Sequence, residues 1–253
     1  MRTRSQRGML VASLLLVGAV AGTATQEATT LALDPPDLKR GVAVMEALSR
    51  RASATEWSDQ ELRRQDLSDL LWAANGINRP DIGKRTAPSA MNAQDVDVYV
   101  FNDDGAYLYD ARQHALRLVF AGDVRAEVTR RPEAAPPSPP PPPAAPPGEA
   151  KSGPPATPTA GYPGGAPQAA PVLLVLVSDI SRFTRGTQEM KLELAAIDTG
   201  IVSQNISLFC AGTGLATRPR ASMNRELIRS LLKLTDSQYP LLNHPVGYPR
   251  PAQ

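Results

Sequence analysis

A polar loop carries the side chains best suited to bind a ligand. It runs from Arg85 to Gln94 and presents Ser89 and Asn92 behind Pro88. Proline stiffens the backbone, while a hydroxyl and an amide together offer donors and acceptors of hydrogen bonds. The edge of a planar heterocycle such as a flavin requires both. Serine, asparagine and proline are also common turn residues, so the loop alone leaves plain turn chemistry open.

Helices are predicted before this loop. Apolar residues at spacings of three and four predict an amphipathic helix from Leu38 to Leu48. The segment Ser58 to Glu61 has the pattern of a capping box. A second helix is predicted from Asp66 to Asn75, and Gly76 is expected to end it in the left-handed cap conformation.

Strands are predicted after the loop. Residues alternate between valine and other side chains from Val96 to Phe101, the period of a strand. The turn signal Asn102 to Gly105 predicts that Ala106 to Asp110 returns antiparallel, and another strand is expected from Leu116 to Phe120.

The last part of the chain supplies a central strand and a long helix. Val172 to Val177 is a continuous apolar run, which is typical of a strand covered on both faces. Leu192 to Ala211 predicts a buried helix, followed by a helix near Arg225 to Leu234 and a strand at Leu241 to Gly247. The long helix carries a row of small residues at spacing four, which suits either helix packing or the approach of a flat ring: Ala195, Thr199, Ser203, Ser207 and Ala211.

Proline dominates the stretch between these two parts. Between Pro132 and Pro171 lie 16 of the chain's 25 prolines. Such a stretch cannot bury a core, so we predict a solvated, extended insert at residues 132–170. Its role is either a recognition arm or a tolerated surface insertion. Because each flanking part looks incomplete alone, we predict one interrupted domain over residues 38–248.

The amino terminus has the features of a secretory signal peptide at residues 1–24. Arg2, Arg4 and Arg7 precede an apolar run from Met9 to Val20 that is too short to span a membrane. The sequence therefore predicts an exported protein, periplasmic or secreted, without a transmembrane segment after signal cleavage.

Composition argues against several classes of function. The net charge is +2, from 27 basic and 25 acidic side chains that are interspersed, so no nucleic-acid partner is expected. Cys210 is the only cysteine, which excludes an intrachain disulfide and a cysteine-rich zinc site. It is expected to be a buried, inert thiol. His114 and His244 lie far apart without nearby carboxylate clusters, so we expect no catalytic metal.

The order of these motifs resembles the nitroreductase superfamily of FMN enzymes. The resemblance is closest to the branch with azoline-oxidising dehydrogenases, and it covers residues 42–120 and 171–248. It rests on the segment Leu67 to Asn78, the polar loop, and the strands that follow. It implies an α+β fold, with an antiparallel-rich mixed sheet flanked by helices around a long central helix. It also implies a homodimer with FMN at the subunit interface.

The resemblance assigns a phosphate site. Arg51 and Ser53 match the Arg-x-Ser of the family's amino-terminal phosphate motif, and Arg220, with Arg218 beside it, matches the carboxyl-terminal basic contact. Each charge-assisted hydrogen bond contributes about 1.5–3 kcal/mol. The family motif continues to a second arginine, where this chain has Thr55. One phosphate contact is therefore missing unless a neighbouring arginine replaces it.

The resemblance also assigns ring contacts. Pro88, Ser89, Ala90 and Asn92 match the Pro-Ser-x-x-Asn loop that reaches the flavin, typically from the other subunit. Residues on the long helix resemble the family's central helix, with structural and cofactor roles both open: Asp198, Gly200, Gln204 and Asn205.

The implied activity is that of an exported oxidoreductase. The family's flavin takes a hydride from a donor such as NADPH or NADH and passes electrons to a quinone, nitroaromatic or similar small molecule. Flavin carries this chemistry, so no catalytic side chain is required. Nicotinamide cofactors are scarce outside the cytoplasm, which leaves direct oxidation of a substrate open. The alternative is a flavin-binding or degenerate, non-catalytic envelope protein with a proline-rich interaction arm.

Overall fold

The computed structural model describes residues 29–130 and 170–250. The predicted signal peptide at residues 1–24 lies outside the described residues. The predicted insert at residues 132–170 also lies outside them, except for Ala170.

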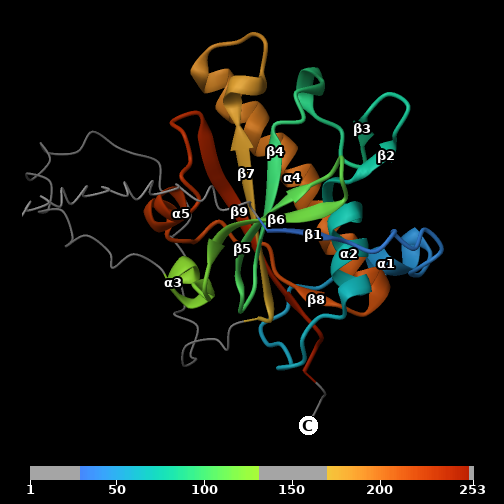
Figure 1. The fold of residues 1–253 in the computed structure, drawn as a ribbon. Coiled ribbons are helices and arrows are strands. Elements are labelled where there is room, and N and C mark those ends of the chain that lie inside the picture. Colours follow the sequence, from blue (N-terminus) through green and yellow to red (C-terminus); the bar gives the residue numbers. More distant parts are fainter. Residues whose placement is uncertain (1–28, 131–169, 251–253) are drawn as a thin grey trace, which may run out of the picture.

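A seven-stranded sheet in the order β1-β6-β5-β4-β7-β9-β8 forms the centre of the fold (Figure 1). In the described residues, neighbouring strands of this sheet pair antiparallel throughout. A separate two-stranded hairpin joins β2 to β3. The strands are β1 (Thr30–Ala32), β2 (Ile77–Arg79), β3 (Lys84–Arg85), β4 (Val96–Phe101), β5 (Gly105–Asp110), β6 (Ala115–Ala121), β7 (Val172–Asp179), β8 (Ala216–Thr217) and β9 (Gln238–Gly247).

Helices cover both faces of the sheet. Residues of α2 and α4 share one hydrophobic core with the sheet, and residues of α3 and α5 share another. Helix α1 packs on α4. The helices are α1 (Val44–Arg50), α2 (Arg64–Asn75), α3 (Arg125–Thr129), α4 (Gln188–Thr213) and α5 (Arg225–Leu231), with short 3-10 turns η1 (Ala90–Asn92) and η2 (Ile180–Arg182). The predicted fold class is confirmed.

Strand β7 shows why its sequence is apolar throughout. Val172, Leu174 and Leu176 belong to the core under α2 and α4, whereas Leu173, Val175 and Val177 belong to the core under α3 and α5. Successive side chains of a strand point to opposite faces, so a strand buried on both sides needs an unbroken apolar run. The prediction of a central strand at this place is confirmed.

Helix α4 is the longest element of the described chain, with 26 residues. Thr187 caps its amino end by accepting a hydrogen bond from the Met190 N–H (3.3 Å), and Gly214 ends it with a left-handed φ of 79°. Its small-residue row is largely buried, as Ala195, Thr199 and Ser203 illustrate. The row therefore brings the helix close to the sheet, as helix packing requires.

Three local predictions before the loop are wrong. The helix from Leu38 to Leu48 is reduced to α1, which starts only at Val44, and Ser58 to Glu61 starts no helix. Gly76 is extended (φ −73°, ψ 170°), because the chain turns from α2 directly into β2. Glycine is needed there for another reason, since a Cβ would lie 2.6 Å from the Trp72 side chain.

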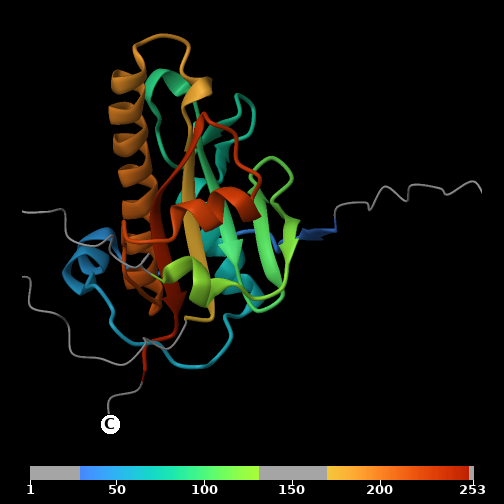
Figure 2. The ribbon, with the colours of Figure 1, turned by 90° about the vertical axis from the view of Figure 1, so that its left-hand side faces the viewer.

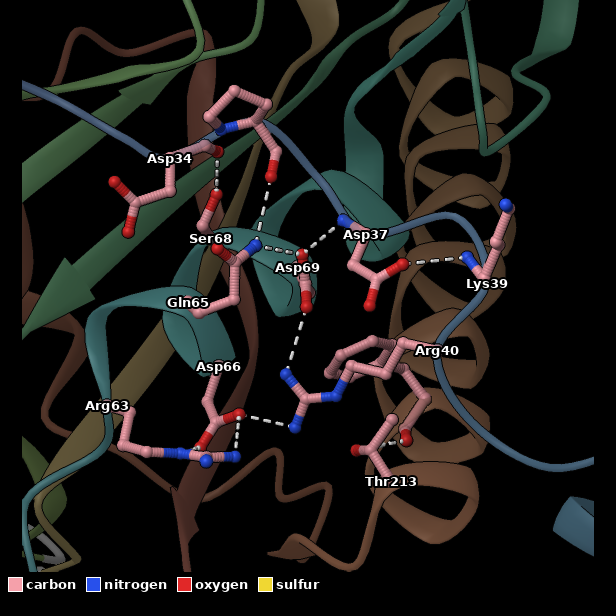
Figure 3. Close-up of polar contacts among 12 residues, drawn as sticks. Asp34, Asp37, Lys39, Arg40, Arg63, Gln65, Asp66, Ser68, Asp69 and Thr213 are labelled. Carbon is pink, nitrogen blue, oxygen red and sulfur yellow. Dashed lines mark hydrogen bonds and ion pairs between the residues drawn. The ribbon is translucent and has the colours of Figure 1, made fainter.

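A buried ionic network keeps the segment before α1 out of a helix (Figure 3). Arg40 pairs with Asp69 (2.9 Å) and with Asp66, and both carboxylates are almost completely buried. The Asp37 N–H donates to Asp69 Oδ1 (2.8 Å), and the Val42 N–H donates to the Gly212 carbonyl (3.1 Å). The segment before α1 is therefore extended across α2, and it places α1 at the carboxyl end of α4.

Deleting residues 132–168 behind a short Gly/Ser linker should leave the fold intact. The first described part ends just after α3, and the second begins at Ala170. Arg125 on α3 joins the two, because its Nη1 donates to the carbonyls of Ala170 (3.2 Å) and Pro171 (2.5 Å). A short linker can therefore bridge the two ends, and a shorter loop costs slightly less closure entropy. Thermal unfolding should shift by less than about 3 °C. If the deletion variant is insoluble while the full-length chain prepared in parallel is soluble, the prediction is wrong.

Candidate functional site

Two of the residues predicted to bind phosphate, Arg51 and Ser53, lie near the carboxyl end of α4. The Ala54 N–H donates to the Thr217 carbonyl (2.9 Å), which lays the exposed Arg51 and Ser53 alongside β8. A cavity of about 150 Å³ opens here between this segment, α4 and β8. Its walls include Ser207 and Ala211, the last two members of the small-residue row.

Arg220 follows β8 and is half-buried beside Arg218. Its backbone pairs with Asn243 of β9 through hydrogen bonds of 2.9 and 2.8 Å, which fixes its position. Its Nε is buried and has no hydrogen-bond partner among the described residues, and neither has the neighbouring Asn243 Oδ1. Burial and then the charge of Arg218 lower the pKa of Arg220. A guanidinium N–H withheld from water without an acceptor is costly, and an anion bound here would offset that cost.

His244 lies behind Arg220, and the sequence did not reveal it as part of the site. It is fully buried on β9, with Nε2 2.8 Å from Ser203 Oγ and Nδ1 3.2 Å from Thr217 Oγ1. Thr217 Oγ1 donates to the Pro245 carbonyl (3.0 Å), so we assign the proton to Nδ1 of a neutral imidazole. Burial and then Arg220 lower the pKa of His244 to about 3. The side chain therefore joins α4, β8 and β9 without adding charge.

Cys210 lines the same cavity from α4. Its side chain is buried, and burial raises the pKa of the thiol above its ordinary value. A thiol with a raised pKa carries little thiolate and is a poor nucleophile. The prediction of a buried, inert cysteine is confirmed.

The polar loop lies at the amino-terminal half of α4. The Ala90 N–H donates to both carboxylate oxygens of Asp198 (2.8 and 3.1 Å), and Ser89 Oγ accepts from the Gln94 N–H (2.8 Å). Pro88 and Asn92 are exposed. Asp198 therefore has a structural role towards the loop, one of the two roles that the sequence left open.

Within one chain, the polar loop lies apart from the segment that carries Arg51 and Ser53. Asp198 holds the polar loop, while Cys210 lines the cavity at the phosphate end. These two residues are separated by roughly 18 Å along the helix axis, at about 1.5 Å per residue. Figure 2 shows the same separation, with α1 beside the lower, carboxyl end of α4 and the polar loop beside its upper end.

Larger cavities lie elsewhere. One of about 310 Å³ lies between α1, α2 and α4, with Arg40, Trp72 and Phe209 among its walls. Another of about 540 Å³ lies beside the β2–β3 hairpin, with Pro35, Pro36 and His114 in its lining. None of the residues predicted to contact phosphate or ring lines either one.

The sequence of this chain matches the Nitroreductase family over residues 48–248. It is 25% identical over 224 residues to a candidate nitroreductase of Methanocaldococcus jannaschii, covering 86% of this chain and 96% of that protein. The crystal structure of a candidate nitroreductase from Ralstonia eutropha is similar, with a TM-score of 0.69, 29% identity, and coverage of 88% of this chain and 90% of that one. A chain of the Escherichia coli microcin synthetase McbBCD complex, with truncated pro-MccB17 bound, shares the fold (TM-score 0.60, 14% identity, 96% and 85% coverage).

Proposed function

Because the chain belongs to the Nitroreductase family, we propose that it is an exported, FMN-dependent oxidoreductase that acts as a homodimer. Electrons would pass through the flavin to or from a small organic molecule such as a quinone or nitroaromatic. The observation that carries this proposal is the unpaired, buried Nε of Arg220, which lies after β8 and against β9.

The residues around Arg220 suit a phosphate. Arg218 adds a second positive charge, and the exposed Arg51 and Ser53 lie on the neighbouring segment beside β8. Guanidinium groups with a hydroxyl offer the charge-assisted hydrogen bonds that a phosphate accepts. The site therefore fits the terminal phosphate of FMN.

The exposed side of α4 favours dimerisation with a second copy of the chain. This helix is long and apolar enough to cross a membrane, yet 44% of its most apolar stretch is buried in one chain and the rest is not. Met190 and Ile197 on α4 are 51% and 59% exposed, and Val44 and Met45 on the adjacent α1 are 65% and 75% exposed. Large apolar side chains exposed on one helix and its neighbour are typical of an interface. A partner there would also bring its polar loop towards this chain's phosphate end.

The protein's part in the reaction is binding and orientation. Arg51, Ser53, Arg218 and Arg220 would hold the phosphate, while Pro88, Ser89, Ala90 and Asn92 of the partner copy would contact the ring. Bound FMN supplies the hydride and electron chemistry, so the chain need provide no acid, base or nucleophile. The electron donor is either NADPH or NADH, or a substrate that the flavin oxidises directly. Export favours the second, because nicotinamide cofactors are scarce outside the cytoplasm.

A flavin-binding or non-catalytic envelope protein is the second candidate function. Thr55, exposed beside the phosphate end, stands where the family has an arginine, and Arg50 is engaged in an ion pair with Glu46 on α1. The predicted phosphate site thus has fewer cations than the family pattern. Bleaching of bound flavin by NADPH, NADH or an organic substrate, followed by reoxidation by an acceptor, separates the two functions, because a non-catalytic protein binds flavin without turnover.

Replacing Arg220 with glutamine should weaken FMN binding about 10- to 100-fold, which corresponds to about 1.5–3 kcal/mol for one charge-assisted contact. The measurement is titration of deflavinated protein, where FMN should bind more tightly than FAD. Arg117→Gln is the matched control, because Arg117 is exposed on β6, away from α4, and its loss should leave affinity unchanged. No saturable FMN binding at micromolar concentration would refute the proposed function.

A further inference from the structure

Two buried carboxyl groups interact beneath the polar loop. Asp95, directly before β4, is fully buried, and Asp198 on α4 is 3% exposed. Asp95 Oδ2 accepts a hydrogen bond from Ser178 Oγ (2.5 Å). Asp95 Oδ1 is buried with no donor among the described residues, and the Asp198 carboxyl is its neighbour.

This pair is best described with one shared proton. Two carboxylates in contact inside a protein cannot both stay charged at neutral pH. Asp198 carries the charge, because it accepts the Ala90 N–H at both oxygens. Asp95 then carries the proton, and its Oδ1–H donates to Asp198, which gives the orphaned oxygen a partner. Burial, followed by the charge of Asp198, raises the pKa of Asp95 to about 7.

The cations near the pair are occupied by other acceptors. Arg182 on η2 is close enough to Asp95 for an electrostatic interaction, but it donates its hydrogen bonds to Asp97 and to the Gln94 carbonyl, each at 2.9 Å. Arg85 on β3, close to Arg182, donates to Gln94 Oε1 (3.1 Å). Ser178 on β7 is the neutral donor already described. A second negative charge on the pair would therefore meet no cation in direct contact among the described residues.

The loop above the pair is conformationally strained. Met91, Asn92 and Gln94 have left-handed φ angles of 54°, 53° and 48°, which side chains other than glycine rarely adopt. Such residues keep these angles only where the surroundings hold them. The bond from the Ala90 N–H to Asp198 ties this loop to α4 by hydrogen bonding, beside the apolar packing of Ala90 and Ala93 on the cluster that contains Ala195. The charge state of the pair therefore affects the hydrogen bond that Asp198 makes to the loop.

We propose that Asp95 and Asp198 are positioning residues that hold the polar loop against α4 only while the two carboxyls share a proton. Loss of that proton leaves two like charges in a buried site. The pair separates, the Ala90 N–H loses its acceptor, and the strained loop relaxes. The consequence for ring binding rests on the proposed function, whereas the tie between loop and helix does not.

The test is hydrogen exchange of the Ala90 amide in the flavin-free full chain, measured by NMR from pH 4.5 to pH 8 and corrected for the intrinsic rate. In the native protein, protection should fall as the pH rises towards 7, by up to about tenfold per pH unit, and should level off above pH 7, since loop release is linked to loss of one proton. Asp95→Asn should show no such fall, because its amide donates permanently to Asp198 and its oxygen still accepts from Ser178. The Val100 amide, inside β4, is the internal control and should stay constant in both proteins.

A flat profile in the native protein, or an equal fall in Asp95→Asn, would overturn the proposal. If the variant does not fold, the ¹³C signals of the two carboxyl groups in the native protein decide. A carboxyl that titrates in step with Ala90 exchange supports the proposal, whereas two carboxyls that both ionise below pH 5 refute it.

FMN titrations over the same pH range separate this inference from the proposed function. If both hold, FMN affinity in the native protein weakens by the same factor as the protection at Ala90, and affinity in Asp95→Asn does not. Absence of FMN binding at every pH, together with pH-dependent exchange at Ala90, would refute the proposed function and leave the positioning role standing.

Discussion

Replacing Arg40 with methionine should lower the free energy of unfolding by about 3 kcal/mol, the cost of breaking a buried ion pair from one side. Asp66 would keep Arg63 and the Tyr248 hydroxyl, but Asp69 would keep only neutral donors. Methionine fills a similar volume, so the loss reports the charge and its hydrogen bonds more than a cavity.

Urea denaturation at fixed protein concentration measures this loss, and the melting temperature should fall by about 6–12 °C. The matched control is Arg50→Met, which breaks the exposed pair with Glu46 on α1 and should cost at most about 0.5 kcal/mol. Equal losses in the two variants would mean that the network of Figure 3 stabilises the fold no more than a surface ion pair does.

Acid should destabilise the protein through His244. The pKa of this buried imidazole is lowered to about 3, whereas that of an unfolded histidine is about 6.5. Between these values the unfolded chain binds the additional proton, so the stability present above pH 6.5 is lost as the pH falls. The loss from this residue between pH 6.5 and pH 4.5 is about 2 kcal/mol. His114, whose pKa is also lowered, acts in the same direction, and Asp95, whose pKa is raised, acts in the opposite one.

The comparison with His244→Asn isolates this contribution, because the other groups titrate in both proteins. At pH 6.5 the variant should be the less stable protein, since it loses part of the bonding to Ser203 and Thr217. By pH 4.5 the difference between the two free energies of unfolding should have moved by about 2 kcal/mol in favour of the variant. A difference that stays constant with pH would show that His244 is not held neutral.

Elements defined by their own side chains were predictable from the sequence. The alternation at Val96 to Phe101 matches β4, the apolar run at Val172 matches the start of β7, and the long apolar segment from Leu192 matches the core of α4. In each case the burial pattern repeats along one element, so local periodicity carries the information.

Features that depend on distant partners were not predictable. The segment after Leu38 has a helical period, but its Arg40 is held by carboxylates on α2. Gly76 was expected to adopt a left-handed cap, yet its role is to make room for Trp72. Periodicity cannot show such contacts, since they join residues far apart in the chain.

The candidate site divides in the same way. The polar loop was conspicuous by composition, while Arg51 and Arg220 stood out only through the resemblance to a family. Asp198 stood out on the long helix, but His244 and Asp95 gave no signal, because a single buried polar residue looks like any other until its partners are known. Their importance follows from burial and hydrogen bonding in the folded chain.

The central claim, that each FMN site is built from two chains, is tested most directly by mixing two damaged proteins. Arg220→Glu would lose phosphate binding and Asn92→Ala would lose a ring contact. Random exchange of subunits should give heterodimers with one intact and one doubly damaged site, so about a quarter of all sites would be intact. Flavin occupancy of the mixture should then exceed that of either parent, while each parent carried alone through the same exchange gains nothing. No gain after confirmed exchange, or a monomer that binds FMN, would contradict the shared site.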